Sequence, residues 1–341
     1  MKILIIKPSG IGDIVHSLPV AIGLKRIYSR CQLHWLVFSK FKDILQNFKY
    51  VDKVLLWDRN AGITEYIKLI KELRKEKYDT IIDLQVLMRT ALLGFLVNFR
   101  RVVSTGFVRE FTDLFVLPVA KFNPDLHAVE RNYQVVEFFA KQENKTLQYP
   151  VELLPWIFID DKEQNVAKNF LSYDKNIRYI IFSVGSRGWH KIWPWENFVK
   201  LIKLLNLRYN NMLPVLVGSK EEVFISERIA ANLNIPYINL TGKTTLRELC
   251  AVINLASMTI SNDNGIAHIS AAMDKPTIIL FGPSNPRWFY PYNKKSGFIY
   301  KNLKCSPCGI RTSCKNNRCM KEISPEEVFD YITSNFDYYL K

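Results

Sequence analysis

Short apolar segments alternate with amphipathic helical patterns along the whole chain, and they form two successive series. The first series has strand-like runs at 3–6, 33–37, 53–57, 80–84 and 102–105, with helical patterns at 14–29, 63–75, 87–99 and 128–141. The second has runs at 179–184, 214–217, 237–240, 258–261 and 277–281, with helical patterns at 195–206, 221–231, 246–256 and 265–273. Strands that alternate with helices are typical of parallel sheets. We therefore predict an α/β fold of two doubly wound, Rossmann-like domains that face a cleft.

The two series are separated by a segment with the composition of a domain crossing. Residues 149–163 contain Pro150 and Pro155 and end near two adjacent aspartates. We expect a first domain over 1–150, a second over 165–322, and a C-terminal helix over 323–341. Ser324 as the N-cap, with Pro325 directly after it, predicts where that helix begins.

Net charge and hydropathy limit the kinds of binding partner and the cellular compartment that we expect for this protein. Lys and Arg outnumber Asp and Glu by 47 to 32, which gives a net charge of +15 without a long basic block. This excess is compatible with nucleic acid, an anionic membrane face or a phosphorylated substrate. No apolar run approaches the ~18 residues of a membrane span, and the first residues read as a strand rather than a signal peptide. We expect a cytoplasmic protein.

The segment 261–268, Ser-Asn-Asp-Asn-Gly-Ile-Ala-His, has the outline of a phosphate site. It reads as a strand that ends in small polar residues and passes through a glycine-containing turn into a helix. A helix that begins at Asn264-Gly265 would direct backbone N–H groups and its positive dipole end at an anion. A purely structural strand–turn–helix unit is the alternative.

The N-terminal strand leads into a similar turn. Pro-Ser-Gly-Ile-Gly-Asp at 8–13 is glycine-rich and places one carboxylate, Asp13, at the start of a helix. The alternative is that Asp13 is an ordinary N-cap. The segment lacks the Gly-x-Gly-x-x-Gly spacing of a dinucleotide fingerprint, which argues against a nicotinamide-dependent oxidoreductase.

A third polar loop, 183–194, follows the first strand of the second series. It carries small hydroxyl groups together with Arg187 and Lys191, which suit phosphate oxygens. An exposed loop anchored by Trp189 and Trp193 is the alternative interpretation.

Four motifs together resemble the ADP-heptose:lipopolysaccharide heptosyltransferase family. They are KPSGIGDIVHSLP at 7–19, HAVERN at 127–132, the loop at 186–194, and SNDNGIAHISAAMDKPTIILFGPSNP at 261–286. HAVERN resembles the branch that adds the first heptose to Kdo on lipid A. The resemblance implies a GT-B-type glycosyltransferase fold and an inverting, metal-independent transfer from ADP-heptose, with no cofactor. The second heptose or another nucleotide-activated sugar remains an alternative, as does a different class of protein, a nicotinamide-dependent oxidoreductase or a basic nucleic-acid-binding module.

The resemblance also implies roles for individual residues. Asp13 matches the general base, and Lys191 matches a lysine that offsets charge on the departing diphosphate, with Ser186 beside it. Glu222 falls near the donor nucleotide, although Glu221 is an alternative. The donor-contact turn corresponds to Asp263, Asn264, Gly265 and His268. Two positions depart from the family pattern: Asn264 stands where threonine is usual, and Arg187, also a donor-binding candidate, replaces a small hydroxyl.

On the acceptor side the resemblance is weaker. Ser9, Gly10 and Gly12 lie in the motif that holds Asp13, while Val86 in the segment 83–90 stands where glycine is typical. Candidates for the acidic Kdo or a lipid phosphate are Arg59, Arg89 and Arg109, weighed against solvated surface arginines. We interpret His127 and Glu130 as helix-start residues.

The six cysteines divide into two kinds. Cys31 and Cys250 lie in apolar contexts and are expected to be buried thiols. The other four are a candidate structural zinc site, with reduced thiols closing a surface loop as the alternative: Cys305, Cys308, Cys314 and Cys319.

The expected partners are a nucleotide-sugar donor and a lipid A-linked Kdo acceptor, with no nucleic acid, and we expect a monomer. Because such an acceptor is lipid-anchored, the basic first domain is expected to contact the anionic cytoplasmic face of the inner membrane peripherally. Aromatic candidates for this contact are Trp57, Phe107, Phe111 and Phe115.

Overall fold

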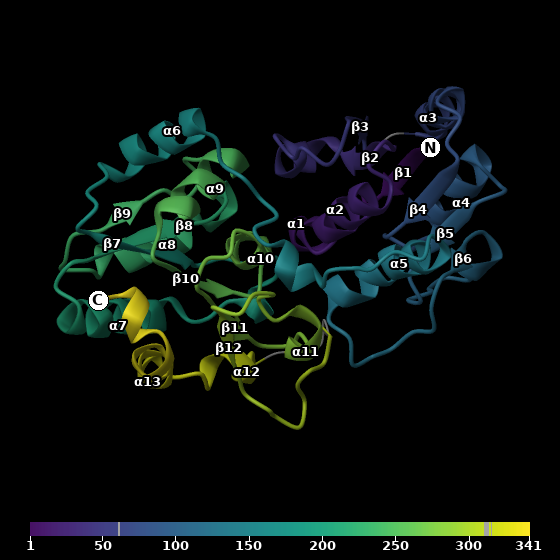
Figure 1. Ribbon diagram of the computed structural model, residues 1–341. Helices are drawn as coiled ribbons and strands as arrows, with labels where there is room; N and C mark the ends of the chain where they lie inside the picture. The colour runs from purple at the N-terminus through teal and green to yellow at the C-terminus, as the bar shows by residue number, and fades with distance from the viewer. Residues whose placement is uncertain (61, 310–313, 315) are drawn as a thin grey trace. The chain divides into compact units, whose positions relative to one another are not determined.

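A computed structural model describes residues 1–60, 62–309, 314 and 316–341. The chain divides into two compact units, Met1–Trp156 and Ile157–Lys341 (Figure 1). Each unit contains one six-stranded sheet, and all strand pairs described in the two sheets are parallel. Helices pack on these sheets, which confirms the predicted α/β class with two Rossmann-like domains. None of the helices in the described part of the chain is long and apolar enough to cross a membrane.

The first sheet has the strand order β3-β2-β1-β4-β5-β6. Its strands are β1 (Lys2–Ile6), β2 (Gln32–Phe38), β3 (Lys53–Trp57), β4 (Thr80–Asp83), β5 (Val102–Ser104) and β6 (Leu117–Pro118). Its α-helices are α1 (Ile11–Val15), α2 (Leu18–Ile27), α3 (Ile63–Lys75), α4 (Met88–Val97) and α5 (Ala128–Gln142), and short 3-10 helices are η1 (Ser39–Leu45), η2 (Thr112–Leu114) and η3 (Pro150–Leu153). The strand order reverses direction between β1 and β4, and ligands of such sheets bind at the carboxyl ends of the strands at this point.

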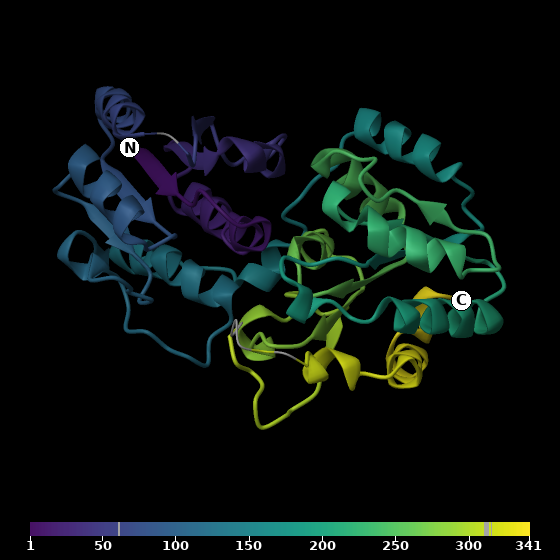
Figure 2. The same cartoon turned by 180° about the vertical axis from the view of Figure 1, so that it is seen from behind.

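Helices cover both faces of the first sheet. In β1, Ile3 and Ile5 point to one face and Leu4 and Ile6 to the other, and all four are fully buried. The helices α2 and α5 lie side by side in the first unit (Figure 2). Gly23 permits this approach, because a Cβ atom there would lie 2.6 Å from Val136 Cγ1.

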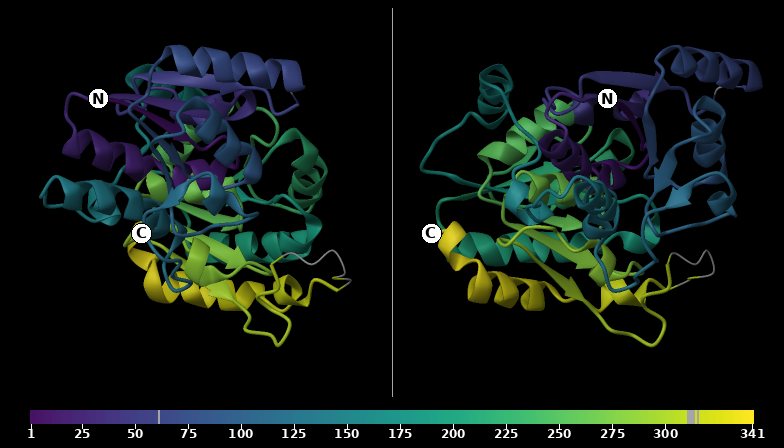
Figure 3. Two further views of the ribbon diagram at one scale, coloured as in Figure 1. Left: turned by 90° about the vertical axis from the view of Figure 1, so that its right-hand side faces the viewer. Right: turned by 45° about the vertical axis from the view of Figure 1, so that its right-hand side comes forward.

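The second sheet has the strand order β12-β11-β10-β7-β8-β9, which reverses between β7 and β10. Its strands are β7 (Arg178–Ser183), β8 (Met212–Val217), β9 (Ile238–Asn239), β10 (Met258–Asn262), β11 (Thr277–Phe281) and β12 (Gly297–Tyr300). Its α-helices are α6 (Asp161–Leu171), α7 (Trp195–Arg208), α8 (Val223–Ala231), α9 (Leu246–Leu255), α10 (Gly265–Ala272), α11 (Pro286–Phe289), α12 (Arg318–Lys321) and α13 (Pro325–Asn335). The 3-10 helices are η4 (Trp189–Lys191), η5 (Lys220–Glu222) and η6 (Asp337–Tyr339). The C-terminal α13 packs beside α7 (Figure 3).

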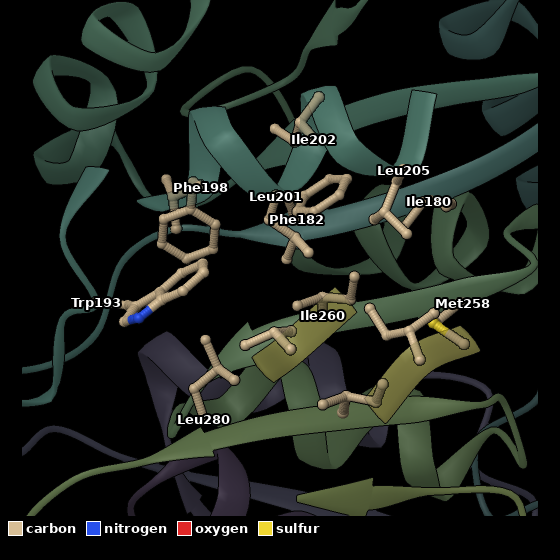
Figure 4. Packing of buried hydrophobic residues seen from close by; sticks show 14 of the residues in the cluster. Ile180, Phe182, Trp193, Phe198, Leu201, Ile202, Leu205, Met258, Ile260 and Leu280 are labelled. Atoms are coloured by element: carbon tan, nitrogen blue, oxygen red, sulfur yellow. The ribbon is translucent and has the colours of Figure 1, made fainter. Parts of the chain in front are cut away.

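The larger core of the second unit lies between its sheet and α7, α8 and α13. Phe198, Leu201 and Leu205 of α7 pack onto Ile180 and Phe182 of β7 (Figure 4). Trp193 closes the end of this core, and its Nε1 donates to the carbonyl oxygen of Ile323 at 2.9 Å. The loop that contains Lys191 is therefore anchored directly to a packed core.

The elements differ from the predicted ones where the local signal was weak. The helical pattern at 14–29 is two helices, α1 and α2, because Pro19 opens a new first turn. The strands β6 and β12 were not predicted, and neither was α6. His127 accepts a hydrogen bond from Val129 N while the Glu130 side chain accepts one from His127 N, so their interpretation as helix-start residues is confirmed. Ser324 likewise caps α13 by accepting from Glu327 N.

Candidate active site

In the second unit, polar residues gather at the carboxyl ends of β7 and β10, where the strand order reverses. Lys191 Nζ lies 2.5 Å from Asp263 Oδ2, and both side chains are largely buried. Ser186 Oγ donates to the carbonyl oxygen of Asp263 at 2.8 Å. His268 Nε2 lies 3.9 Å from Asp263 Oδ1. The structure thus brings together four residues that the sequence placed in two separate motifs.

Asn264 fixes the turn before α10. Its Oδ1 accepts from Ile266 N at 2.9 Å and from Ala267 N at 3.3 Å. Its Nδ2 donates to Ser183 Oγ at 2.8 Å and to Gly185 O at 2.7 Å. The prediction that α10 directs its N–H groups at a ligand therefore needs correction for Ile266 and Ala267, because the Asn264 side chain already accepts from both.

Asn262 was missed by the sequence reasoning as a residue that organises the candidate site. It is fully buried, its Oδ1 accepts from Trp193 N at 3.0 Å, and its Nδ2 donates to Val184 O at 2.8 Å. It therefore joins the end of β10 to the loop that carries Lys191. The signal was present, since an asparagine directly after the predicted buried strand 258–261 needs hydrogen-bond partners in the interior.

Glu222, rather than Glu221, reaches the carboxyl ends of β7 and β8. Its Oε2 accepts from Ser219 N at 2.6 Å. A Cβ atom on Gly185 would lie 1.8 Å from Glu222 Oε1, and one on Gly218 would lie 2.6 Å from Oε2. The two glycines leave the space that this carboxylate occupies, whereas Glu221 is exposed. Arg187 is also exposed and is not drawn into the Lys191 cluster by any contact described.

In the first unit, Asp13 stands in the first turn of α1 with its side chain exposed. The N-cap of α1 is Gly10, which has φ 82°, so Asp13 is not the N-cap. A Cβ atom on Gly10 would lie 2.4 Å from Asp13 Oδ2, so the carboxylate lies close over the glycine. The glycine-rich turn therefore determines where this carboxylate is held. Ser9 and Gly12 belong to the same turn, and Ser9 Oγ lies 3.4 Å from Gln85 Oε1.

A buried charged group lies beside Asp13, at the reversal point between β1 and β4. Lys7 Nζ donates to Leu84 O at 2.9 Å, and Asp13, Asp83 and Arg109 all act on its charge. Burial lowers the pKa of the Lys7 ammonium and raises the pKa of the Asp83 carboxyl to about 6. The sequence reasoning missed Lys7, because nothing in the sequence shows that the ammonium of a lysine directly before a turn is buried.

Asp83 organises the loop that follows β4. Its Oδ1 accepts from Gln85 N at 2.9 Å and Val86 N at 3.1 Å, and its Oδ2 accepts from Thr90 Oγ1 at 2.8 Å. Val86 has φ 51°, a left-handed conformation that explains why glycine suits this position. Arg109 Nη2 donates to Gln85 O at 3.3 Å, which connects Arg109 to the same loop.

The three acceptor-side arginines have different surroundings. The Arg89 guanidinium lies 4.3 Å from the Trp57 ring centre, and its Nη1 donates to Arg59 O at 3.0 Å. Arg59 borders a depression of about 560 Å³ at the carboxyl ends of β2 and β3. The depression also contains Lys40, a second cation that the sequence reasoning missed, and the whole lining is Phe38, Ser39, Lys40, Trp57, Asp58, Arg59 and Asn60.

The four C-terminal cysteines border one cavity of about 450 Å³ together with His190. Burial and the neighbouring thiols raise the pKa of the Cys319 thiol to about 11. Across the described parts of the chain, however, no three His, Cys, Asp or Glu side chains are arranged to hold a metal ion. The arrangement therefore gives no support to the structural zinc interpretation. Cys31 and Cys250 are buried, as expected.

Comparison with known proteins identifies the class to which these two sheets and their polar edges belong. The structure of an E. coli heptosyltransferase, WaaC with ADP, superposes on this chain with a TM-score of 0.74 and is 23% identical in sequence. The match covers 98% of this chain and 100% of the E. coli chain. The fold is therefore that of the GT-B-type glycosyltransferases. The family model of glycosyltransferase family 9 (heptosyltransferase) matches residues 66–318, and the chain belongs to this family.

Named relatives include both heptosyltransferases 1 and heptosyltransferases 2. Lipopolysaccharide heptosyltransferase 1 of Campylobacter coli is 26% identical over 98% of this chain and 99% of its own length. Lipooligosaccharide heptosyltransferase 2 of Haemophilus ducreyi is 29% identical over 88% of each chain. The chain is thus a glycosyltransferase, and the oxidoreductase and nucleic-acid-binding interpretations are set aside.

Proposed function

We propose that this protein transfers a heptose from ADP-heptose to the Kdo region of a lipid A-linked acceptor, with inversion at the anomeric carbon and without a metal. The observation that carries the proposal is the cluster of Lys191, Ser186 and Asp263 at the reversal point of the second sheet. It combines a cation and a hydroxyl group where a nucleotide diphosphate would bind. Family membership and a solved relative with ADP support the choice of donor.

The second unit would hold the donor. Glu222 is suited to accept hydrogen bonds from the ribose hydroxyls, because its carboxylate lies over the glycine-lined strand ends. Lys191 is positioned to balance the charge that develops on the diphosphate when the glycosidic bond breaks, with Ser186 as a neutral donor. Asp263 holds the Lys191 ammonium in place before the donor binds. Asn264, Gly265 and His268 complete the turn at the phosphates and the sugar.

Asp13 would act as the general base. It accepts the proton of the acceptor hydroxyl while that oxygen attacks the anomeric carbon, and the bond from that carbon to the diphosphate breaks in the same displacement. The transition state is oxocarbenium-like, and one displacement inverts the configuration.

The first unit would hold the acidic acceptor. The cations Lys7, Arg109, Arg59 and Lys40 lie along the carboxyl ends of its strands. They suit the carboxylate of Kdo or a lipid phosphate. Arg89 contributes to this surface by holding Trp57 and the Arg59 backbone in place, because its guanidinium is occupied by contacts with both. We place the enzyme in the cytoplasm as a monomer.

Addition of the first heptose is the favoured step. The Campylobacter relative that is covered almost end to end is a heptosyltransferase 1. The HAVERN segment supports this choice only indirectly, because His127 and Glu130 form the capping contacts of α5. Addition of the second heptose, or transfer of another nucleotide-activated sugar, is the second candidate, since heptosyltransferases 2 are among the relatives.

A product assay with two acceptors tests the proposal. Purified protein and ADP-heptose are incubated either with Kdo₂-lipid A or with the same acceptor already carrying one heptose, and products are identified by mass spectrometry. A gain of one heptose on the first acceptor alone supports the proposed step. A gain only on the second acceptor supports the second candidate, and no gain on either contradicts heptose transfer to this region.

A further inference from the structure

The aromatic residues that composition suggested for membrane contact do not share one environment. Trp57 is buried, and Phe107 and Phe115 are half-buried, each in contact with another aromatic ring. Phe111, in contrast, is 79% exposed. The candidate surface therefore has to be defined again from the structure.

Phe111 belongs to a short exposed apolar segment between β5 and β6. Leu114 is 73% exposed and Leu117 is 60% exposed, so the segment 109–117 presents three large apolar side chains to solvent. Single exposed apolar residues are ordinary, but several within one short segment are characteristic of an interaction surface. β6 is an edge strand of only two residues, and its Pro118 protects the edge from pairing with another strand.

The backbone is strained in the conformation that exposes Phe111. Glu110 has φ 54° and Phe111 has φ 57°, two consecutive left-handed residues of which neither is glycine. This conformation is costly for a bulky side chain and persists only where surrounding contacts maintain it. Phe111 therefore combines a costly backbone conformation with an exposed apolar ring, and both are unfavourable in the isolated protein.

Contacts on both sides of the strained pair hold it in place. Glu110 Oε2 accepts from Met88 N, the first N–H of α4, at 2.9 Å. Arg109 Nη2 donates to Gln85 O at 3.3 Å. On the other side, Thr112 is fully buried and the Phe115 ring lies 5.5 Å from the Phe95 ring. The segment is thus fixed to the loop after β4 and to α4 on either side of the exposed Phe111.

The charge around the segment favours an anionic partner. Residues 99–122 contain four basic side chains, Arg100, Arg101, Arg109 and Lys121, and two acidic ones. One of these two, Glu110, is engaged by the backbone of α4. All four cations are exposed, and of these Arg101 also donates from Nη2 to Gln142 Oε1 of α5. Exposed apolar side chains and exposed cations in the same stretch of chain match an anionic lipid surface, where the rings enter the interface and the cations meet the headgroups.

We propose that the segment 109–117, through the exposed side chains of Phe111 and Leu114, is the surface by which this enzyme docks on an anionic lipid bilayer. The choice of a bilayer over a second copy of the chain rests on the proposed function, in which the acceptor is lipid-linked. Through Arg109 the docking segment is joined to the Gln85 loop beside Ser9, so lipid contact and acceptor binding lie on one continuous piece of the first unit.

Co-sedimentation with vesicles tests the proposal without substrates. The full chain is mixed with vesicles of phosphatidylcholine alone or with 30% phosphatidylglycerol, at about 0.1 M and about 0.5 M salt. We expect binding to the anionic vesicles that weakens at least tenfold in the Phe111→Ser/Leu114→Ser double variant. The matched control is Leu207→Ser/Phe224→Ser, two exposed apolar residues on α7 and α8 of the second unit, and it should bind like the wild type.

A second variant separates docking from folding. Phe111→Gly removes the ring and relieves the left-handed strain, so it should be at least as stable as the wild type in thermal unfolding and still lose vesicle binding. Unchanged binding of both variants overturns the proposal. A dimer in analytical ultracentrifugation that the double variant abolishes also overturns it, in favour of a second copy of the chain.

Heptose transfer to a soluble acceptor, measured with the double variant, distinguishes a failure of the docking proposal from a failure of the proposed function. If heptose transfer occurs, the double variant should retain it on a deacylated Kdo acceptor, and a loss there would overturn docking by placing the segment in the acceptor site. If the wild type binds vesicles through Phe111 but transfers no heptose, the docking surface stands and the proposed function fails.

Discussion

Gly10 is the residue on which the position of Asp13 depends most directly. Its φ of 82° is unfavourable for any residue with a side chain, and a Cβ atom there would lie 2.4 Å from the Asp13 carboxylate. Glycine therefore serves two purposes at once, the turn after β1 and the space for the proposed base.

The first prediction follows for Gly10→Ala. Displacing a catalytic group by about 1 Å costs about a hundredfold in rate, so kcat should fall by about that factor. ADP affinity should stay unchanged, because the proposed nucleotide contacts lie in the second unit. Steady-state kinetics and calorimetry measure the two effects, with Gly62→Ala as the control, since Gly62 has an ordinary φ of −69°. A normal kcat in Gly10→Ala would contradict the assigned position of Asp13.

The second prediction concerns Asp83, whose pKa burial raises to about 6. The folded state then binds more protons than the unfolded chain between about pH 4 and 6, so this group makes the free energy of unfolding fall as pH rises. Between pH 5 and 7 the loss is about 1 kcal/mol. Asp83→Asn should remove it, because an amide does not titrate and can still bond to Thr90 and the Gln85 N–H.

Urea denaturation at pH 5 and pH 7 measures this difference for the wild type and for Asp83→Asn. The exposed aspartate Asp58, changed to asparagine, is the control from the same unit. The same pH dependence in the wild type and in Asp83→Asn would show that the buried carboxyl does not titrate in this range.

At the scale of elements, the glycines at the ends of β7 and β8 determine where Glu222 lies. Gly185→Ala should displace the Glu222 carboxylate, since the new Cβ would lie 1.8 Å from it. We expect ADP affinity to fall about tenfold, as for loss of one hydrogen-bonded carboxylate. If the effect acts through Glu222, the double variant Gly185→Ala/Glu222→Ala should bind ADP no more weakly than Glu222→Ala alone. Additive losses in this cycle, measured by calorimetry, would place the role of Gly185 elsewhere.

The elements also show what the sequence could predict. Strands such as β1 and β7 are apolar on both faces and stand out from their surroundings, so the two α/β series were recognisable. β6 has two residues and β12 has four, too few for a pattern. In α6 only Ala167 and Leu171 are buried, so its polar sequence resembled a linker.

The candidate site also has residues that the sequence could predict and residues that it could not. Motifs contiguous in sequence gave the candidates Asp13, Lys191 and Asp263, whose catalytic and binding roles stay predictions. Asn262 and Lys7 were missed because their roles depend on the partners that tertiary packing supplies, at Trp193 N and Leu84 O. The number of cysteines suggested a metal with reduced thiols as the alternative, and the side-chain arrangement that distinguishes the two depends on tertiary packing rather than on the count of cysteines.

At the scale of the whole molecule, the proposed mechanism assigns leaving-group stabilisation to Lys191 and Ser186 rather than to a metal. Enzyme treated with EDTA and returned to metal-free buffer should therefore keep its rate within about twofold. Lys191→Met should lower kcat by about a hundredfold or more, the range found when one transition-state donor is removed. Loss of activity with EDTA that Mg²⁺ restores would contradict this assignment.

Transfer by the wild type and by Asp13→Asn, measured side by side, tests the central claim most directly. Each protein is incubated with ADP-heptose and Kdo₂-lipid A, the product is quantified by mass spectrometry, and ADP binding is measured on the same samples. The account predicts a one-heptose product from the wild type, and a rate at least about a hundredfold lower from Asp13→Asn with unchanged ADP affinity. Equal rates from the two proteins would contradict the role of Asp13 as the base, and no product from a folded, ADP-binding wild type would contradict the proposed substrates.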